Sequence, residues 1–204
     1  MFKKFDICGF FLRSFLSFIL LFLYLSSASY AIDGAPFWAK DGEPISTAEG
    51  GNWQLSSYRI AGDSGGNAFV AWVEKRTGEN YNKVFVQRIS NAGAVGGNSW
   101  FLNGKNVCWF DYDLWGQSGP EIVGDGSGGA IVAWVDSRAI DYPGMGTTGA
   151  DIYAQKFNSD GDIQWPATGA TQLDGISVCA ASGNQGGIEI IGDGAGGAII
   201  AWTN

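Results

Sequence analysis

The chain has 204 residues, of which 46% are hydrophobic and 32 are glycine, and it contains nine Trp but no His. This composition is typical of a packed, turn-rich β protein rather than a disordered chain. The net charge of −8 opposes binding to nucleic acid phosphates, and no basic cluster interrupts the acidic sequence. Without His, the chain can carry neither Ser-His-Asp nor Cys-His catalysis, nor a His-ligated metal.

The first 31 residues have the order of features of a secretory signal peptide. Basic residues come first, and an uncharged run of twelve residues, 14–25, follows. Small residues then lead to Ala31 and supply the positions that signal peptidase needs. Because the uncharged run is shorter than the ~20 residues that span a bilayer, we expect residues 1–31 to be a cleaved signal peptide, with an uncleaved anchor as the alternative. The protein is then secreted or at the cell surface, and meets a membrane only through this leader.

An internal repeat fills residues 32–204. Three segments align: AGDSGGNAFVAWVEKR at 61–76, VGDGSGGAIVAWVDSR at 123–138, and IGDGAGGAIIAWTN at 191–204. The Asp and Trp in these segments recur at spacings of 62 and 68 residues. A fixed period of this kind is the signature of an array of small structural units.

Each unit reads as four short strands separated by Gly, Asp and Asn. The second strand is apolar at nearly every position, at 68–73 and 130–135, so we expect both of its faces to be covered. Covering on both faces favours β-propeller blades packed between neighbours, with a β-solenoid as the alternative. The sequence therefore predicts an all-β fold, a partial β-propeller with two full four-stranded antiparallel blades and incomplete flanking ones.

The expected divisions of the repeat region are the end of a preceding blade, two repeats and a partial third, at 32–57, 58–108, 120–179 and 188–204. Without its first 31 residues the 204-residue chain keeps 173, fewer than three units of about 65, whereas propellers close with ~4 blades or more. Two explanations stay open: the chain is part of a longer array, which its end in mid-repeat favours, or it assembles with other copies.

Several polar and aromatic residues recur around this centre, and we interpret them as scaffolding. They are Gln87 and Gln155; Gln54, Gln117 and Gln185; Arg76 and Arg138, each two residues after an acid; and Trp38, Trp100 and Trp165, each four residues before a Gly (Gly42, Gly104, Gly169). Cys108 and Cys179 also match, and equivalent positions in neighbouring units usually lie beyond the ~7 Å limit for a disulfide. We expect two separate, buried thiols, with a disulfide between them as the alternative in an exported protein.

The glycine turns carry a recurring acid at Asp63, Asp125 and Asp193. Residues 124–129 and 192–197 match the dinucleotide pattern G-x-G-x-x-G, but they lead into strands rather than a helix, so we expect hairpin turns. Each Asp should accept hydrogen bonds from its own turn's backbone amides. Calcium at these three residues is the alternative; otherwise we expect no cofactor.

The most distinctive unrepeated segment is CWFDYDLW at 108–115. It supplies an aromatic-plus-acid patch of the kind that stacks on sugars and bonds their hydroxyls. The candidate ligand-binding residues are Trp109, Asp111, Tyr112, Asp113 and Trp115. The alternative is that these rings fill the gap between blades.

The units resemble repeats of large secreted bacterial proteins with β-propeller-like blades. The resemblance rests on the pattern Gly-Asp-Gly-x-Gly-Gly-Ala, two β-branched residues and Ala-Trp, followed later in the unit by Asp-Ile-Tyr-Ala-Gln. The resemblance covers nearly all of residues 32–204 and implies an extracellular or surface-attached array. Residues 158–165, NSDGDIQW, are also loosely similar to the Asp-box of sialidase-like propellers: Asp160 and Trp165 fit, whereas Asn158 and Asp162 depart from it. This resemblance transfers no catalytic residue.

These observations predict a non-enzymatic exported scaffold that acts as an adhesion or glycan-binding module. We expect it to recognise an extracellular glycan or protein through the loops at 108–115 and 139–150. The alternative is a fragment of a propeller-type glycoside hydrolase that uses a carboxylate pair, with Asp111 or Asp113 as the acid.

Overall fold

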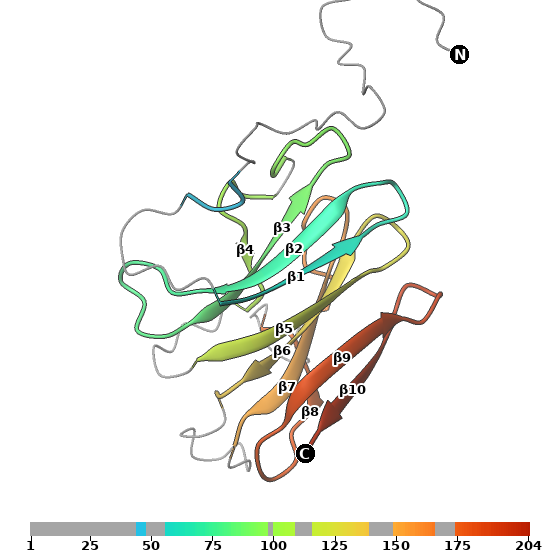
Figure 1. The fold of residues 1–204 in the computed structure, drawn as a ribbon. Helices are drawn as coiled ribbons and strands as arrows, with labels where there is room; N and C mark the ends of the chain where they lie inside the picture. Colours follow the sequence, from blue (N-terminus) through green and yellow to red (C-terminus); the bar gives the residue numbers. More distant parts are fainter. Residues whose placement is uncertain (1–43, 48–55, 98–99, 109–115, 139–148, 166–173) are drawn as a thin grey trace, which may run out of the picture. The chain divides into compact units, whose positions relative to one another are not determined.

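The computed structural model of the chain describes residues 44–47, 56–97, 100–108, 116–138, 149–165 and 174–204 (Figure 1). All of them belong to one unit, Trp38–Asn204. Their regular structure consists of ten β-strands in three antiparallel sheets, which confirms the all-β prediction. In this part of the chain, no helix has the length and apolarity that a membrane crossing needs.

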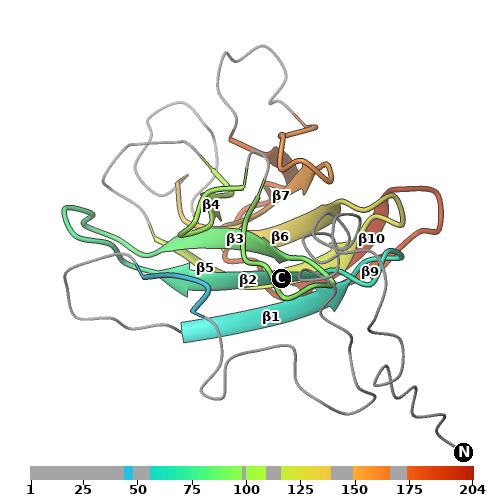
Figure 2. The same cartoon turned by 90° about the horizontal axis from the view of Figure 1, so that it is seen from above.

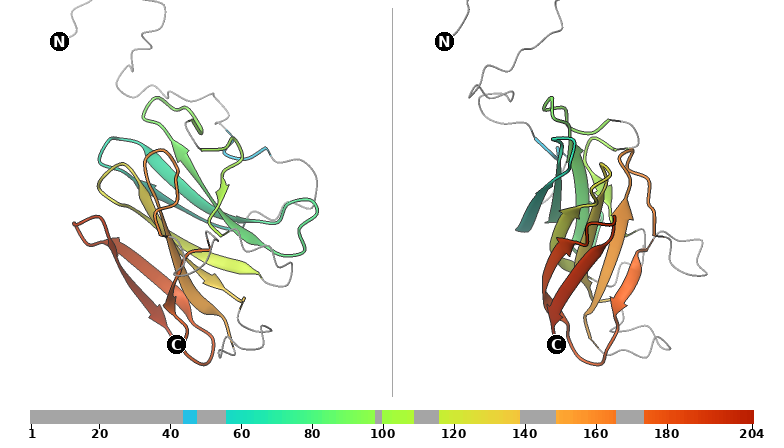
Figure 3. Two further views of the ribbon diagram at one scale, coloured as in Figure 1. Left: turned by 180° about the vertical axis from the view of Figure 1, so that it is seen from behind. Right: turned by 90° about the vertical axis from the view of Figure 1, so that its right-hand side faces the viewer.

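Each sheet is a meander in which a strand pairs with its neighbour in sequence. The first sheet contains β1 (Ser56–Gly62), β2 (Ala68–Glu74), β3 (Lys83–Ile89) and β4 (Lys105–Asn106). The second contains β5 (Gln117–Gly124), β6 (Ala130–Asp136), β7 (Asp151–Phe157) and β8 (Ile176–Cys179). The third contains β9 (Gly186–Gly192) and β10 (Ala198–Thr203). The strand orders can be followed from above in Figure 2 and from two further sides in Figure 3.

The second strand of each full sheet is buried on both faces, as its unbroken apolar run predicts. In β2, Phe69, Ala71 and Val73 pack against residues of the second sheet, including Val132. The residues between them, such as Trp72, pack in a separate cluster. The equivalent positions of β6 are arranged in the same way: Ala130, Val132 and Trp134 face the preceding, first sheet, whereas Ala133 packs with Ile188 of β9 in the following one. The second sheet therefore lies between the other two.

Trp100 fills the space between the first two sheets. Its ring centroid lies 5.7 Å from that of Phe69 in the first sheet and 5.7 Å from that of Phe157 in the second. Its indole Nε1 donates a hydrogen bond to the carbonyl oxygen of Ser159 at 3.0 Å. One repeated Trp therefore joins two sheets by ring packing and by a hydrogen bond.

Two details differ from the sequence-based expectations. Both described cysteines are free thiols, but only Cys108 is buried, because Cys179 lies half-buried in β8. The glycine equivalent to Gly104 is Gly175 and not Gly169, since Gly104 and Gly175 have the same φ of 77° and the same contact with a buried Trp. Gly169, Gly42 and Gln54 lie outside the described residues.

Candidate functional site

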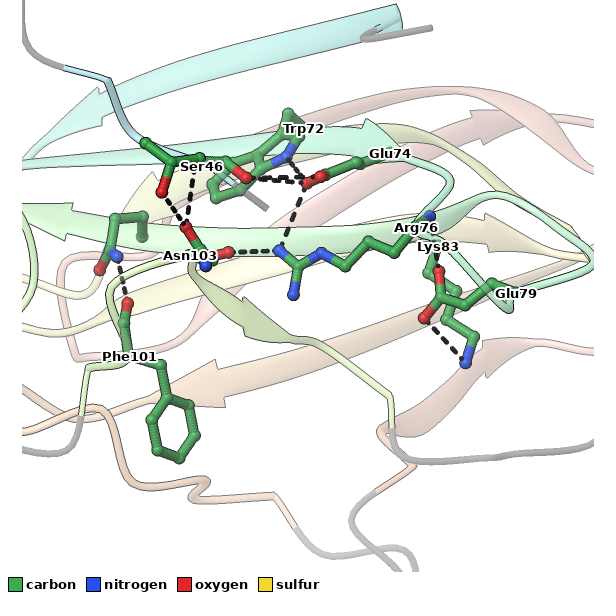
Figure 4. Close-up of polar contacts among 10 residues, drawn as sticks. Ser46, Trp72, Glu74, Arg76, Glu79, Lys83, Phe101 and Asn103 are labelled. Carbon is green, nitrogen blue, oxygen red and sulfur yellow. Dashed lines mark hydrogen bonds and ion pairs between the residues drawn. The ribbon is translucent and has the colours of Figure 1, made fainter. Parts of the chain in front are cut away.

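A buried carboxylate and an arginine fix the end of β2 (Figure 4). Glu74 accepts a hydrogen bond from the indole Nε1 of Trp72 at 2.8 Å and lies 3.3 Å from Nη2 of Arg76. The Arg76 guanidinium also donates to the carbonyl oxygen of Asn103 and lies 3.5 Å from the ring centroid of Phe85. These contacts connect β2 with β3 and with the turn before β4, which agrees with a scaffolding role.

The second sheet contains the same set of contacts. Asp136 accepts a hydrogen bond from Nε1 of Trp134 at 2.9 Å and one from Nη2 of Arg138 at 2.6 Å. Arg138 also donates to the carbonyl oxygen of Asp174 and stacks on Tyr153 at 3.8 Å. Burial works against the charge of Arg138, but its hydrogen bond and attraction to Asp136 outweigh this and raise its pKa above the ordinary value.

A cavity of about 700 Å³ opens beside the first of these two sets, at β3, β4 and the turn that follows β7. Its walls carry three basic side chains, two acidic ones and two aromatic rings. These residues are Arg76, Lys83, Lys105, Glu79, Asp162, Phe85 and Phe101. We call this the β3–β4 cavity.

Each basic side chain of the β3–β4 cavity has an acidic neighbour, namely Glu74 for Arg76, Glu79 for Lys83 and Asp162 for Lys105. Lys83 lies 3.4 Å from a carboxylate oxygen of Glu79. Lys105 donates to the carbonyl oxygen of Gly161, and its Nζ lies 5.4 Å from the ring centroid of Phe101. Partial burial lowers the pKa of Lys105, although the negative charge of Asp162 opposes this shift. An anion entering the cavity would favour the charged form of Lys105.

Phe101 gives the cavity an apolar surface, because its side chain is 61% exposed. An accessible ring next to charged donors and acceptors is the combination that binds a sugar, whose ring has an apolar face and a rim of hydroxyls. The β3–β4 cavity can therefore bind and orient a polar ring compound.

Apart from Arg76, the basic and aromatic residues of this cavity were not predicted from the sequence. The signal that would have found them is a departure from the repeat: Lys83 aligns with Asp151, Phe101 with Pro166, and Lys105 with Ile176.

A buried glutamine joins the second sheet to the first. Gln117 in β5 accepts a hydrogen bond from the backbone N of Val84 at 2.8 Å and donates to Asp136 at 3.2 Å. Its own backbone N donates to the carbonyl oxygen of Asn82 at 2.9 Å. Directly before β9, the backbone N of Gln185 makes the corresponding bond to the carbonyl oxygen of Ala150 at 2.8 Å. The position of the cavity walls relative to each other depends on such bonds.

The three turn aspartates have the backbone contacts expected of them. Oδ1 of Asp63, Asp125 and Asp193 each accepts two hydrogen bonds, from the amides two and four residues later in the same turn, at 2.7–2.8 Å. The aspartates therefore stabilise the hairpin turns that the sequence predicts.

The second carboxylate oxygen of two of these residues also has a partner. Oδ2 of Asp63 accepts a hydrogen bond from the Asn67 side chain at 2.6 Å, and Oδ2 of Asp125 lies 3.2 Å from Nζ of Lys156. Calcium at either turn would have to displace these partners. Among the described residues, no group of three or more Cys, Asp or Glu side chains is placed to hold a metal ion.

All five candidate ligand-binding residues from the sequence, Trp109, Asp111, Tyr112, Asp113 and Trp115, lie outside the described residues, as do 139–148 of the second candidate loop. The structure therefore neither brings them together nor separates them. No protein-family model, curated protein or solved structure matches the chain.

Proposed function

We propose that this chain is an exported, non-enzymatic repeat scaffold, with its sheets as the blades of a partial β-propeller, and that it binds extracellular glycans carrying carboxylate groups at the β3–β4 cavity. One observation carries the proposal: three basic and two acidic side chains line a single cavity beside an exposed ring. A ligand that carries both a carboxylate and hydroxyl groups matches such a mixed lining, because ammonium groups donate to the carboxylate and carboxylates accept from the hydroxyls.

The chemistry of the cavity supports a sugar acid as the ligand. Lys83 and Lys105 offer ammonium groups to a carboxylate, and Glu79 and Asp162 offer oxygens to hydroxyl groups. The exposed ring of Phe101 offers a stacking surface for the apolar face of the sugar. The predicted signal peptide and the resemblance to repeats of secreted bacterial proteins support an extracellular ligand of this kind.

The proposal is tested by calorimetric titration of the full chain with oligogalacturonate and with its methyl ester, which keeps the sugar backbone but masks the carboxylates. We expect binding of the acid and at least about tenfold weaker binding of the ester, because charge-assisted hydrogen bonds contribute about 1.5–3 kcal/mol each. Equal binding of both compounds, or of neither, would overturn the proposed ligand class.

Variants locate the site. Lys83→Gln and Phe101→Ala should each weaken binding of the acid, whereas Lys75→Gln, which removes an exposed lysine outside the cavity, should leave it unchanged. If all three variants bind as the parent does, the β3–β4 cavity is not the site.

The same ligands distinguish the binding module from the alternative function, a propeller-type glycoside hydrolase. Release of reducing ends from oligogalacturonate or from a chromogenic glycoside panel, lost in Asp111→Asn or Asp113→Asn, would favour the enzyme. Retention of ligand without turnover favours the binding module. Loss of retention in Tyr112→Ala with Trp115→Ala would instead place recognition in the segment 108–115.

A further inference from the structure

The two contacts between neighbouring sheets are built in the same way. In the second and third sheets, the first strand turns one face toward the preceding sheet, and that sheet covers the face. Ile122 of β5 packs in the cluster shared with the first sheet, and Ile188 of β9 packs in the cluster shared with the second. Their side chains are 8% and 5% exposed.

The corresponding face of β1 is uncovered. Ile60 occupies the position of Ile122, two residues before the glycine that ends the strand, and Tyr58 occupies the position of Ile188. These two side chains are 68% and 74% exposed. On the same side of the first sheet, Trp72 of β2 and Phe85 of β3 are buried.

At the other end of the series, the third sheet has an uncovered face that points forward. Ile191 of β9 and Ile199 of β10 are directly paired across the hairpin, so their side chains lie on the same face. They are 61% and 59% exposed. Ile131, which occupies the position of Ile199 in the second sheet, is completely buried.

Charge also matches between the two uncovered faces. Between the first two sheets, Arg59 of β1 forms an ion pair with Glu121 of β5 at 2.7 Å, and half of the arginine side chain stays exposed. The position equivalent to Arg59 in the third sheet is Glu189, which is exposed. A β1 strand placed after the third sheet would therefore bring an arginine to this glutamate.

We propose that a second copy of this chain docks head to tail, with the β1 face of one copy (Tyr58 and Ile60) on the β9–β10 face of the other (Ile191 and Ile199). The contact continues the arrangement that the chain already uses twice within itself. It joins two different surfaces, so it is a heterologous contact, and it does not depend on glycan binding.

The experiment is sedimentation velocity of the full chain, up to about 200 µM because a contact of this limited area is expected to be weak. We expect the parent to associate as its concentration rises. A head-blocked variant (Tyr58→Asp, Ile60→Asp) and a tail-blocked variant (Ile191→Asp, Ile199→Asp) should each remain monomeric. An equimolar mixture of the two should form a dimer and nothing larger, because one intact face of each kind remains.

Matched controls keep the test decisive. A third variant, Tyr81→Asp with Leu102→Asp, changes exposed apolar side chains that belong to none of the strands β1, β9 and β10, and it should associate like the parent. Unchanged urea unfolding midpoints would show that the blocked variants still fold. A monomeric parent, a mixture of blocked copies that does not dimerise, or equal dissociation of the control would each overturn the proposal.

Discussion

Two glycines are required where a tryptophan edge meets the backbone. Gly104 and Gly175 both have φ of 77°, and a Cβ at either would collide with the ring of Trp72 or Trp134. A side chain there would therefore bear two costs, left-handed backbone strain and overpacking.

Gly104→Ala is accordingly expected to destabilise the protein far more than Gly78→Ala. Gly78 has φ of 86°, but a Cβ there would have no atom within 4 Å, so its replacement costs only the backbone strain, about 1 kcal/mol. Overpacking against Trp72 should add about 1–3 kcal/mol at Gly104. Urea unfolding of the two variants measures the difference, and equal losses would contradict the Trp contact.

The turn aspartates link stability to pH. Partial burial raises the pKa of Asp125, but hydrogen bonds from Ser127, Gly129 and Lys156 outweigh it and hold the pKa below its ordinary value. Because the pKa of Asp125 is lower in the folded than in the unfolded protein, its negative charge stabilises the folded protein at pH values above the unfolded-state pKa. This stabilisation is lost as the pH falls through the folded-state pKa.

We therefore expect the stability difference between the parent and Asp125→Asn to shrink as the pH falls from about 5 to 2. Asparagine keeps the oxygen that accepts the backbone bonds but carries no charge to titrate. Unfolding midpoints in urea across this range measure the effect, and parallel curves for the two proteins would argue against it.

At this scale the sequence predicted the turn aspartates but misassigned a glycine. The backbone bonds of Asp63, Asp125 and Asp193 are local, so residue type and spacing were sufficient. Gly175 was missed because the spacing of four residues between Trp100 and Gly104 does not recur after Trp165, where the chain is longer before the equivalent glycine. Counting four residues back from Cys108 and Cys179 finds Gly104 and Gly175 directly.

At the scale of elements, the same Trp–carboxylate–Arg set has different surroundings in the two full sheets. The carboxylates are buried at both sites, since the side chains of Glu74 and Asp136 are 1% and 3% exposed. The arginines differ, because the side chain of Arg138 is 6% exposed whereas that of Arg76 is 23% exposed where it borders the β3–β4 cavity. Solvent can therefore enter more easily where Arg76 is lost than where Arg138 is lost.

Arg138→Met should therefore destabilise the protein by about 3 kcal/mol or more, because it leaves a buried carboxylate without its cation. Arg76→Met should cost less, since water reaches Glu74 through the cavity once the guanidinium is gone. Chemical denaturation of both variants gives the comparison. A larger loss in Arg76→Met would show that the first pair is the more important one.

Strands were predictable from the sequence, whereas the cavity was not. The apolar runs of β2 and β6 and the glycine turns before them specify the meander locally. The β3–β4 cavity joins Lys83, Lys105 and Asp162, which are distant in sequence, and only the packing of the second sheet on the first brings them together. No local pattern records that relation.

For the whole molecule, burial falls from the middle of the series to its end. All residues of β6 but one are fully buried, whereas most of β10 is exposed. Local opening is easiest where few buried contacts hold a strand.

Hydrogen exchange should reflect this gradient. We expect amides of β6 to exchange slowest and those of β10 fastest in dilute protein, measured by mass spectrometry of peptides that cover each strand. If copies dock head to tail, protection of β9 and β10 should rise with concentration while that of β6 stays constant. Uniform exchange along the series would contradict the gradient.

The close approach of successive Gly-Asp turns restricts where this protein can diversify. A Cβ on Gly124 would meet the carbonyl oxygen of Gly62 in the preceding turn, and Gly192 follows Gly124 in the same row. By strand direction, the β2–β3 and β6–β7 connections leave from the opposite ends of the hairpins, where one is already six residues longer than the other between Arg and Gln. The β1–β2 and β5–β6 turns should therefore keep their length, while insertions and new specificities accumulate in the β2–β3 and β6–β7 connections.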